Sequence, residues 1–259
     1  QLNKLREINT HEQQTTEWYA FRWNHITASS AWKCFGTQKK QNEIILKKCK
    51  PIQDYSNSYV NVNSAFHHGH KYEPLSVMLY EKKYNTKIEE FGCLEHECIS
   101  YLAASPDGIN VDPTNKLYGR LLEIKNPVSR KITGIPKKDY WIQMQLQMAC
   151  TGLYTCDFLE TMFKSYENEE EFKLDGNFCK TKDGKQKGII VCFWKENEPI
   201  YEYAPLDIGE EEFEKWNEEI FEKYEGLTWG GNTYWKLDTY SCVSVPFCRL
   251  WFEKALPYF

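Results

Sequence analysis

The chain has 259 residues, of which 41% are hydrophobic and 27% are charged, with 14 Phe, 17 Tyr and 9 Trp. This composition predicts a folded chain with a substantial core and excludes the disordered, collagen-like and coiled-coil classes. No apolar run approaches the roughly 20 residues of a membrane span. The N-terminus has no apolar signal core, so we expect an intracellular protein that does not contact the membrane.

Charge is unevenly distributed along the chain. In total, 32 Lys and Arg residues face 37 Asp and Glu residues, and the net charge of −5 by itself argues against a nucleic-acid partner. Residues 1–140, however, contain 20 basic and 15 acidic residues, whereas residues 141–259 contain 12 and 22. Any basic surface is therefore expected to come mostly from the first half.

The ten cysteines form no Cys-x-x-Cys pair. The nearest approach to a zinc-binding pattern is Cys93-Leu-Glu-His96-Glu-Cys98, whose spacing is a weak match. Several cysteines, such as Cys192, lie in apolar strand-like runs, which favours buried, reduced thiols. A reducing compartment is the corresponding expectation.

Hydrophobic periodicity and turn residues predict an elaborated α/β chain. Leu75, Met78 and Leu79 lie at helical core spacing, and Pro106 and Gly108 mark a turn. The loop at 181–185 and the aromatic C-terminal tail are expected to be additions to the core. In chain order, the predicted elements are a polar N-terminal helix, a helix-permissive segment at 16–35, a helix and loop within 38–66, a helix at 64–84, strands at 87–94, 101–104 and 117–124, a segment around 140–152, strands at 155–163 and 188–194, and an amphipathic helix at 209–224.

The segment Trp141-Ile-Gln-Met-Gln-Leu-Gln-Met148 alternates like a strand, but its Met, Leu and Gln residues favour a helix. On a helical wheel, Gln143 and Gln147 lie opposite the apolar arc, and Gln145 lies near the middle of that arc. A buried amide is costly unless it has partners. Gln145 is therefore either a core residue bonded to backbone groups or a residue pointed into a polar site beneath the helix.

Asp107, Glu123 and Lys125 are candidates for a reaction centre. Glu123 and Lys125 share one face of the predicted strand, because side chains alternate with a period of 2. Mg²⁺ prefers carboxylate oxygens and retains several waters, so two acidic side chains at adjacent strand ends suit it. An ammonium beside them helps to hold or deprotonate an attacking water. Taken alone, Glu-x-Lys is usually a solvated strand edge.

The combination of motifs is more specific than its parts. Ala103-Ala-Ser-Pro-Asp-Gly108, followed by Leu122-Glu-Ile-Lys-Asn-Pro127, resembles the signature of the PD-(D/E)xK nuclease superfamily. One departure is Asn126, where the related sequences usually have Cys. Four further features are similar to the YqaJ-type viral recombinase and phage lambda exonuclease family: Trp18-x-x-x-Arg22-x-x-x-Ile26-Thr-Ala-Ser29, Gly69-x-x-x-Glu73, Ser129-Arg130 and Tyr140-x-x-Gln143-x-Gln145.

The resemblance implies a PD-(D/E)xK, restriction-endonuclease-like fold of the α/β (α+β) class, in which helices flank a mixed central sheet in the order αβββαβ. We expect a single nuclease domain over residues 1–259, with its core at about 64–165. An N-terminal helical element at 1–63 is expected to contribute to a phosphate pocket. Strands and a helix at 166–259 are expected as C-terminal additions.

The resemblance also implies a metal site. Asp107 and Glu123 resemble the carboxylates that bind Mg²⁺, for which Mn²⁺ can substitute, and the Ile124 carbonyl is a further expected ligand. Glu73 resembles the helix carboxylate that completes the site directly or through water. Lys125 resembles the catalytic lysine.

A second set of residues is implied for the helix and for the DNA end. Gln145 and Gln143 resemble the glutamines of the helix motif, and Gln145 is expected close to the metal. Guanidinium forks pair well with phosphate oxygens, and hydroxyls add directed donors. The residues that match the 5′-phosphate site of lambda-type exonucleases are Arg22, Ser29, Ser105 and Arg130.

Ordinary structural roles stay open for these residues. Glu73 is compatible with a surface helix carboxylate, Ser29 with a helix cap and Ser105 with a turn. Arg22 and Arg130 are compatible with solvated side chains. Phe66-His67-His68-Gly-His70 resembles a metal-binding tract but lacks a closed ligand set for zinc.

The expected function is that of a Mg²⁺-dependent DNA exonuclease that hydrolyses phosphodiesters from duplex ends, 5′→3′, and leaves 3′ single strands for recombination or DNA processing. One alternative is an endonuclease or RNA-cleaving nuclease on the same metal core. Another is a catalytically inactive nucleic-acid-binding module. The resemblance also implies a homo-trimer, a single-strand annealing or recombinase partner, and the host cytoplasm or nucleus as the compartment.

Overall fold

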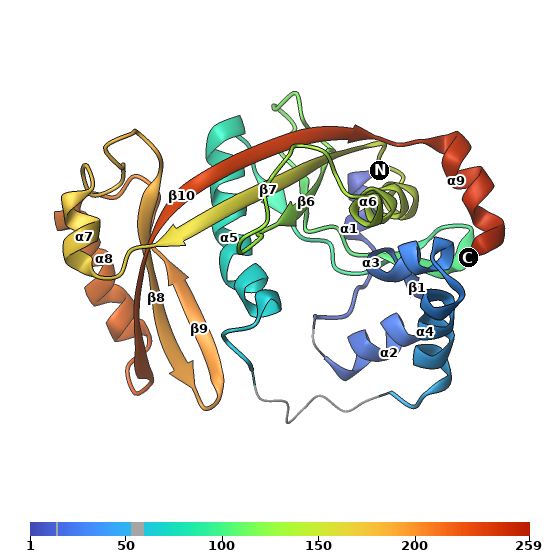
Figure 1. Cartoon of the computed structure of the whole chain (residues 1–259), viewed down its shortest axis with the longest axis horizontal. Helices are drawn as coiled ribbons and strands as arrows, with labels where there is room; N and C mark the ends of the chain where they lie inside the picture. Colours follow the sequence, from blue (N-terminus) through green and yellow to red (C-terminus); the bar gives the residue numbers. More distant parts are fainter. Residues whose placement is uncertain (14, 53–59) are drawn as a thin grey trace.

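The computed structural model describes residues 1–13, 15–52 and 60–259, and its framework is a pair of β-sheets (Figure 1). The strands are β1 (Ile26–Thr27), β2 (Ile88–Glu89), β3 (Leu94–His96), β4 (Ile99–Ala104), β5 (Gly108–Asn110), β6 (Leu121–Lys125), β7 (Thr155–Ser165), β8 (Lys187–Lys195), β9 (Glu198–Tyr203) and β10 (Thr228–Pro246). The larger sheet has the order β2-β5-β6-β7-β10-β8-β9, and the smaller sheet has the order β1-β4-β3. The larger sheet is mixed, because β6 and β7 are parallel while its other neighbours are antiparallel.

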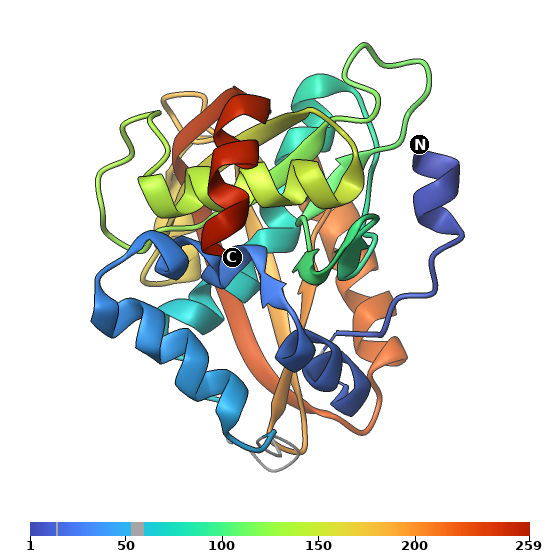
Figure 2. The same ribbon diagram turned by 90° about the vertical axis from the view of Figure 1, so that its right-hand side faces the viewer.

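Helices flank the larger sheet, which confirms the expected α/β class. Figure 2 shows α6 crossing the sheet, with α9 beside it. In that region α3, α6 and α9 share one apolar cluster, to which Ala31, Leu146 and Phe252 belong. The helices are α1 (Leu2–Arg6), α2 (Thr16–Asn24), α3 (Ala28–Ala31), α4 (Gln38–Cys49), α5 (Ala65–Tyr84), α6 (Lys138–Thr151), α7 (Glu169–Leu174), α8 (Glu210–Lys223) and α9 (Arg249–Ala255).

Strand β6 lies between two helices, and its alternation decides which side chain faces which helix. Leu121 packs in a cluster with Met144 and Met148 of α6, whereas Leu122 packs with Tyr80 of α5. Because side chains alternate with a period of 2, Glu123 points to the α6 side. The β6-α6-β7 unit is a parallel crossover, so the carboxyl ends of β6 and β7 lie at the same edge of the sheet.

The C-terminal tail is part of the sheet rather than an addition to it. Residues 235–246 of β10 pair with β7, and residues 228–236 pair with β8, so β10 joins the two halves of the sheet. This strand was not predicted. Most of its residues are half-buried, so burial does not alternate regularly along it. Trp235 is its buried anchor.

The strands expected at 87–94 and 117–124 differ from the observed ones. The first is divided into β2 and β3, because the chain turns at Gly92 with φ +70°. The second begins only at Leu121, because residues 117–120 form a turn that includes Gly119 at φ +76°. β5 was missed because its first residue, Gly108, was assigned to a turn. Gly108 packs closely on β2, since a Cβ at this position would lie 2.2 Å from Ile88 Cγ2.

The remaining predicted elements largely correspond to observed ones. The helices expected at 64–84, 140–152 and 209–224 correspond to α5, α6 and α8. The strands at 101–104, 155–163 and 188–194 correspond to β4, β7 and β8. Within 38–66, the predicted helix is α4, and residues 53–59 of the predicted loop lie outside the described residues.

All ten cysteines are free, as expected, but only five of them are buried. Cys49 and Cys98 are exposed. Across residues 1–13, 15–52 and 60–259, none of the helices combines the length and apolar character needed to cross a membrane.

Candidate active site

Asp107 lies where the pairing between β5 and β6 ends. Its backbone N–H donates to the Leu122 carbonyl at 3.1 Å, which is the last bond of that ladder. The next N–H of β6, that of Ile124, donates to Asp107 Oδ2 at 2.6 Å. The Asp107 carboxylate thus takes the place of a backbone acceptor, and this bond fixes it beside β6.

Glu123 is fully buried on the α6 side of β6. One of its oxygens, Oε1, forms an ion pair with Lys125. The other, Oε2, accepts a hydrogen bond from Gln147 Nε2 of α6 at 2.6 Å. The same nitrogen lies 3.2 Å from the Ser105 carbonyl, so Gln147 connects Glu123 to the segment that leads to Asp107.

Charges in this cluster are unbalanced. Burial raises the pKa of Asp107 well above its usual value, and the charge of Glu123 raises it further. Burial, followed by the charges of Glu90 and Glu123, raises the pKa of Glu73 to about 7. Burial lowers the pKa of Lys125, but the charges of Glu123 and Asp107 outweigh it and raise that pKa above its usual value. The ammonium group of Lys125 therefore acts on all three carboxylates, those of Asp107, Glu123 and Glu73.

The donor set fits a hard divalent cation better than zinc. Among the described residues, no group of three or more His, Cys, Asp or Glu side chains is placed to enclose a metal. Mg²⁺ needs only one or two carboxylates, because it keeps waters and binds substrate phosphates. Within the described parts, the buried Gln147 Oε1 also lacks a hydrogen-bond partner, and a bound water can satisfy such an oxygen.

The position of Gln145 differs from the expected one. Its Nε2 donates to the Pro246 carbonyl at 3.1 Å, and its Oε1 accepts from Cys248 N–H at 2.6 Å. It is thus a buried amide bonded to backbone groups, and it joins α6 to the connection between β10 and α9. The glutamine that contacts Glu123 is Gln147, which the helical wheel placed opposite the apolar arc.

The helical wheel placed Gln147 away from the core because it did not anticipate that α6 is covered on two sides. One side packs on the sheet through Met144 and Met148, and another packs on α3 and α9 through Ile142 and Leu146. A helical wheel assumes one core-facing arc, whereas here the polar row between two apolar faces points at the carboxylates. Gln143 is half-buried and lies one turn before Gln147, so its proximity to the site stays a prediction.

Two pairs of residues involve the predicted phosphate ligands. Arg22 Nη2 lies 3.5 Å from Ser29 Oγ, and the Arg22 guanidinium stacks on Trp18 with its central carbon 4.4 Å from the ring centroid. Arg130 Nη2 lies 2.5 Å from Glu160 Oε1. Neither arginine is merely solvated.

Contacts with neighbouring residues place Arg130 and Ser105 near the carboxylates. Glu160 on β7 is the register partner of Lys125, and the Arg130 guanidinium lies 5.7 Å from the Tyr140 ring, over which Lys125 Nζ also lies at 5.2 Å. The Ser105 carbonyl contacts Gln147. Sequence reasoning missed Glu160, whose only signal was a charged residue inside an apolar strand.

Two residues of the histidine tract make contacts within the fold. His67 Nε2 lies 2.7 Å from the Tyr201 hydroxyl, which joins α5 to β9. His68 packs on Tyr72, with 4.6 Å between their ring centroids. In the segment at residues 93–98, which weakly resembles a zinc-binding pattern, His96 also makes contacts within the fold. Its Nδ1 accepts from Cys98 N–H at 3.1 Å, and its ring stacks on Phe252.

Comparison with known proteins places this arrangement in a family. Residues 17–154, a little over half of the chain, match the YqaJ-like viral recombinase domain. The chain belongs to this family. A mimivirus relative, Uncharacterized protein R354 of Acanthamoeba polyphaga mimivirus, is 30% identical over an alignment of 295 residues. The alignment covers 99% of this chain and 52% of the relative. This YqaJ-like chain thus spans about half the length of the curated relative it matches.

Solved structures similar to this YqaJ-like chain include an alkaline exonuclease, LHK-Exo. Its complex with dAMP is 20% identical, covers 94% of this chain and 88% of its own, and has a TM-score of 0.51. A second structure of LHK-Exo, from Laribacter hongkongensis, is 32% identical, covers 57% of this chain and 74% of its own, and has a TM-score of 0.46. The likeness to the dAMP complex shows that this chain shares the fold of LHK-Exo.

Proposed function

We propose that this protein is a divalent-cation-dependent exonuclease that degrades duplex DNA from its ends, 5′→3′, and leaves 3′ single strands. The observation that carries the proposal is the convergence of Asp107, Glu123 and Lys125 at one edge of the sheet, with Glu123 held by Gln147. Family membership supports it.

In this proposal, Asp107, Glu123 and the Ile124 carbonyl hold Mg²⁺, with Mn²⁺ as a substitute, and Glu73 completes the site directly or through water. When bound, the cation supplies Lewis acidity toward the phosphoryl oxygen. Lys125 lies beside these carboxylates and orients the attacking water. Gln147 fixes the Glu123 carboxylate in one orientation, which preserves the site geometry during turnover.

Recognition of a 5′-phosphate gives the reaction its direction. Arg22 and Ser29 supply one guanidinium and one hydroxyl, and Arg130 and Ser105 supply another such set. A guanidinium binds phosphate through two parallel hydrogen bonds, so these residues select an end that carries a phosphate monoester. An end captured in this way places the first phosphodiester of that strand at the carboxylates.

The test is digestion of linear duplex DNA labelled at one 5′ or one 3′ end, in the presence of Mg²⁺. We expect early release of the 5′ label and faster digestion of 5′-phosphorylated than of 5′-hydroxyl duplexes. Asp107→Ala is expected to abolish cleavage. Its matched control is Asp112→Ala, because the Asp112 side chain accepts hydrogen bonds from the Thr114 backbone N–H and hydroxyl, within its own turn.

Other outcomes favour the alternatives. Cleavage of closed circular DNA at internal sites, with indifference to the 5′-phosphate, indicates an endonuclease. Degradation of RNA at a rate comparable to that of DNA indicates a broader nuclease. An intact substrate with wild-type protein and Mg²⁺ contradicts the proposal and favours a binding module.

We extend the proposal to assembly and setting. A ring of three subunits around duplex DNA, a single-strand annealing or recombinase partner, and action in a reducing host compartment follow from the family resemblance. Molar mass measured by light scattering with and without a DNA end tests the ring. A monomer in both conditions contradicts it.

A further inference from the structure

Asn126 directly follows Lys125 and makes three hydrogen bonds with its side chain. Its Oδ1 accepts from Ser76 Oγ of α5 at 2.8 Å and from Thr161 Oγ1 of β7 at 2.6 Å. Its Nδ2 donates to the Gly69 carbonyl of α5 at 3.2 Å. The Ser76 and Thr161 side chains are fully buried, and their hydroxyl oxygens lie 2.7 Å apart. One amide thus joins β6, β7 and α5.

These contacts bracket Glu73 on α5. Gly69 lies four residues before Glu73 and Ser76 lies three residues after it, so all three are on one helix face. In an α-helix, the carbonyl of residue 69 also accepts the backbone N–H of residue 73. Asn126 therefore binds the same helical turn that carries the Glu73 carboxylate, on the side that faces β6.

That turn of α5 has to be held against a repulsion. The negative charges of Glu73 and Glu123 disfavour each other, and Lys125 offsets them only in part. The apolar anchors of α5 next to Glu73, Tyr72 and Leu75, pack in a cluster with Phe163 of β7 and Trp235 of β10 and not with residues of β6. Near Glu73, the hydrogen bonds of Asn126 link α5 directly to the residue that follows β6.

We propose that Asn126 is a positioning residue that fixes Glu73 of α5 relative to Asp107 and Glu123, and thereby sets the affinity of the site for a divalent cation. This inference rests on the proposed function, because it assigns Glu73 to the cation site. It adds a residue that touches neither the cation nor the DNA. A hydrogen-bonded partner of this kind tunes a metal site by holding its ligands in place.

The test is titration of the full chain with Mn²⁺ by calorimetry. Asn126→Ala is expected to weaken Mn²⁺ binding by about tenfold or more. Thr161→Val preserves the size and β-branching of a buried strand residue but removes the hydroxyl, so it is expected to fold normally and weaken Mn²⁺ binding severalfold. Thr161→Ser keeps the hydroxyl and is expected to bind Mn²⁺ with the affinity of wild type.

The matched control is Asn110→Ala. Asn110 is a fully buried asparagine of β5, and its Oδ1 accepts from Thr86 Oγ1 at 2.6 Å and from Asp112 N–H at 3.1 Å, beyond the far end of α5. Its loss is expected to lower stability without changing the affinity for Mn²⁺. Hydrogen exchange gives a readout without cation: Asn126→Ala is expected to speed exchange in residues 69–76, and Asn110→Ala is not.

The outcomes separate this inference from the proposed function. If wild-type protein binds Mn²⁺ but Asn126→Ala and Thr161→Val bind it equally well, the positioning role is overturned and the proposed function stands. If wild-type protein binds no Mn²⁺, the cation site is overturned and this inference falls with it. Weaker binding in Asn110→Ala as large as in Asn126→Ala also overturns the inference, because it indicates a general loss of stability.

Discussion

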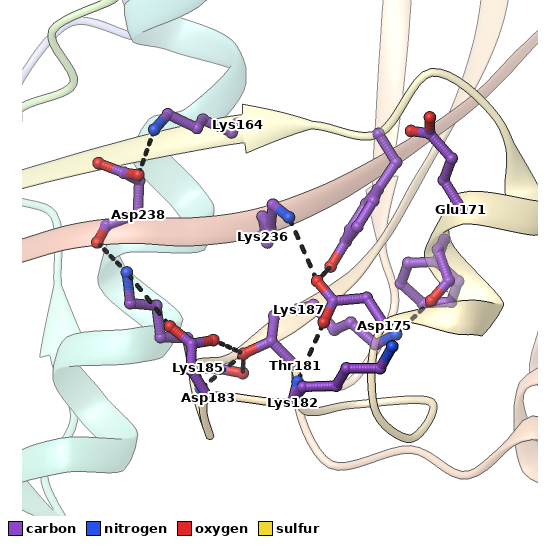
Figure 3. A network of polar contacts seen from close by, with 12 residues as sticks. Lys164, Glu171, Asp175, Thr181, Lys182, Asp183, Lys185, Lys187, Lys236 and Asp238 are labelled. Atoms are coloured by element: carbon purple, nitrogen blue, oxygen red, sulfur yellow. Dashed lines mark hydrogen bonds and ion pairs between the residues drawn. The ribbon is translucent and has the colours of Figure 1, made fainter.

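Two carboxylate clusters in this molecule follow opposite rules. In the candidate active site, the ammonium group of Lys125 acts on Asp107, Glu123 and Glu73, and the pKa of Asp107 and of Glu73 is raised. In the second cluster, Asp175 accepts hydrogen bonds from the Tyr166 hydroxyl at 2.7 Å, Lys182 N–H at 3.0 Å and Lys236 Nζ at 3.2 Å (Figure 3). The bond from Lys182 N–H is the largest cause of its lowered pKa.

The neighbours of Asp175 extend this balance of charge. The Thr181 hydroxyl lies 2.5 Å from Asp183, and Lys164 lies 2.5 Å from Asp238. These bonds lower the pKa of both carboxyl groups. Carboxylates that are satisfied within the fold stabilise it, whereas carboxylates that crowd one another are poised for a cation from outside. We interpret the first cluster as functional and the second as structural.

The largest expected effect comes from making the same Asp→Ala substitution in each cluster. Asp107→Ala is expected to lower nuclease activity by about a thousandfold or more, because the cation loses a ligand worth several kcal/mol in the transition state. Its stability is expected to change by less than about 1 kcal/mol, since the lost bond to Ile124 N–H and the relieved repulsion oppose each other. The measurements are cleavage rate and urea unfolding.

Asp175→Ala is the counterpart and is expected to show the reverse. Activity stays near that of wild type, and stability falls by about 1–2 kcal/mol, discounted for the partial exposure of the group. Equal losses of activity in the two variants contradict the distinction between the clusters.

The next largest expected effect is the change in cleavage and in the free energy of unfolding when the cation is removed and added back. A chelator is expected to abolish cleavage, and Mg²⁺ at 100 times its dissociation constant is expected to raise the free energy of unfolding by about 2.7 kcal/mol. Asp175→Ala retains this increase, and Asp107→Ala loses it. Urea unfolding with and without Mg²⁺ measures it. A Mg²⁺-induced stabilisation that survives in Asp107→Ala places the cation elsewhere.

The glutamines of α6 extend the comparison to amides. Gln147→Leu is expected to lower the cleavage rate by about 10- to 100-fold, because Glu123 loses the group that orients it. Gln145→Leu is expected to destabilise the fold by about 1–3 kcal/mol, since it leaves the Pro246 carbonyl and the Cys248 N–H unpaired. Cleavage rates and unfolding free energies of both variants are the measurements. A larger rate loss in Gln145→Leu than in Gln147→Leu restores the role that the motif implied.

The sequence predicted the residues at strand ends better than those on α6. Asp107, Glu123 and Lys125 could be placed together because a strand period of 2 and a turn leave few geometries for neighbouring strands. The choice between Gln145 and Gln147 could not be made correctly from the sequence, because it depends on how α3, α9 and the β10–α9 connection pack around α6. Those contacts come from chain ends more than 90 residues from α6.

The second cluster could not be predicted from the sequence for a related reason. Asp175, Lys182 and Lys236 lie in a loop and a distant strand that carry no motif, and burial does not alternate regularly along β10. Local patterns identify elements whose faces differ in burial, and β10 has half-covered faces. Its place between β7 and β8 follows from pairing over long sequence separations, which periodicity does not encode.

The smallest expected effect is the pH dependence of the second cluster. Because the pKa of Asp175 is lowered from 3.8 by its hydrogen bonds, its contribution to stability is fully present above the unfolded-state pKa and is lost as the pH falls through the folded-state pKa. Asp175→Asn keeps the shape but has no charge to lose. The difference in unfolding free energy between wild type and this variant is therefore expected to stay constant from about pH 7 to pH 5 and to shrink below about pH 4. Urea unfolding at pH 7, 5, 4 and 3 measures the difference, and a constant difference down to pH 3 means that the charge of Asp175 does not stabilise the fold.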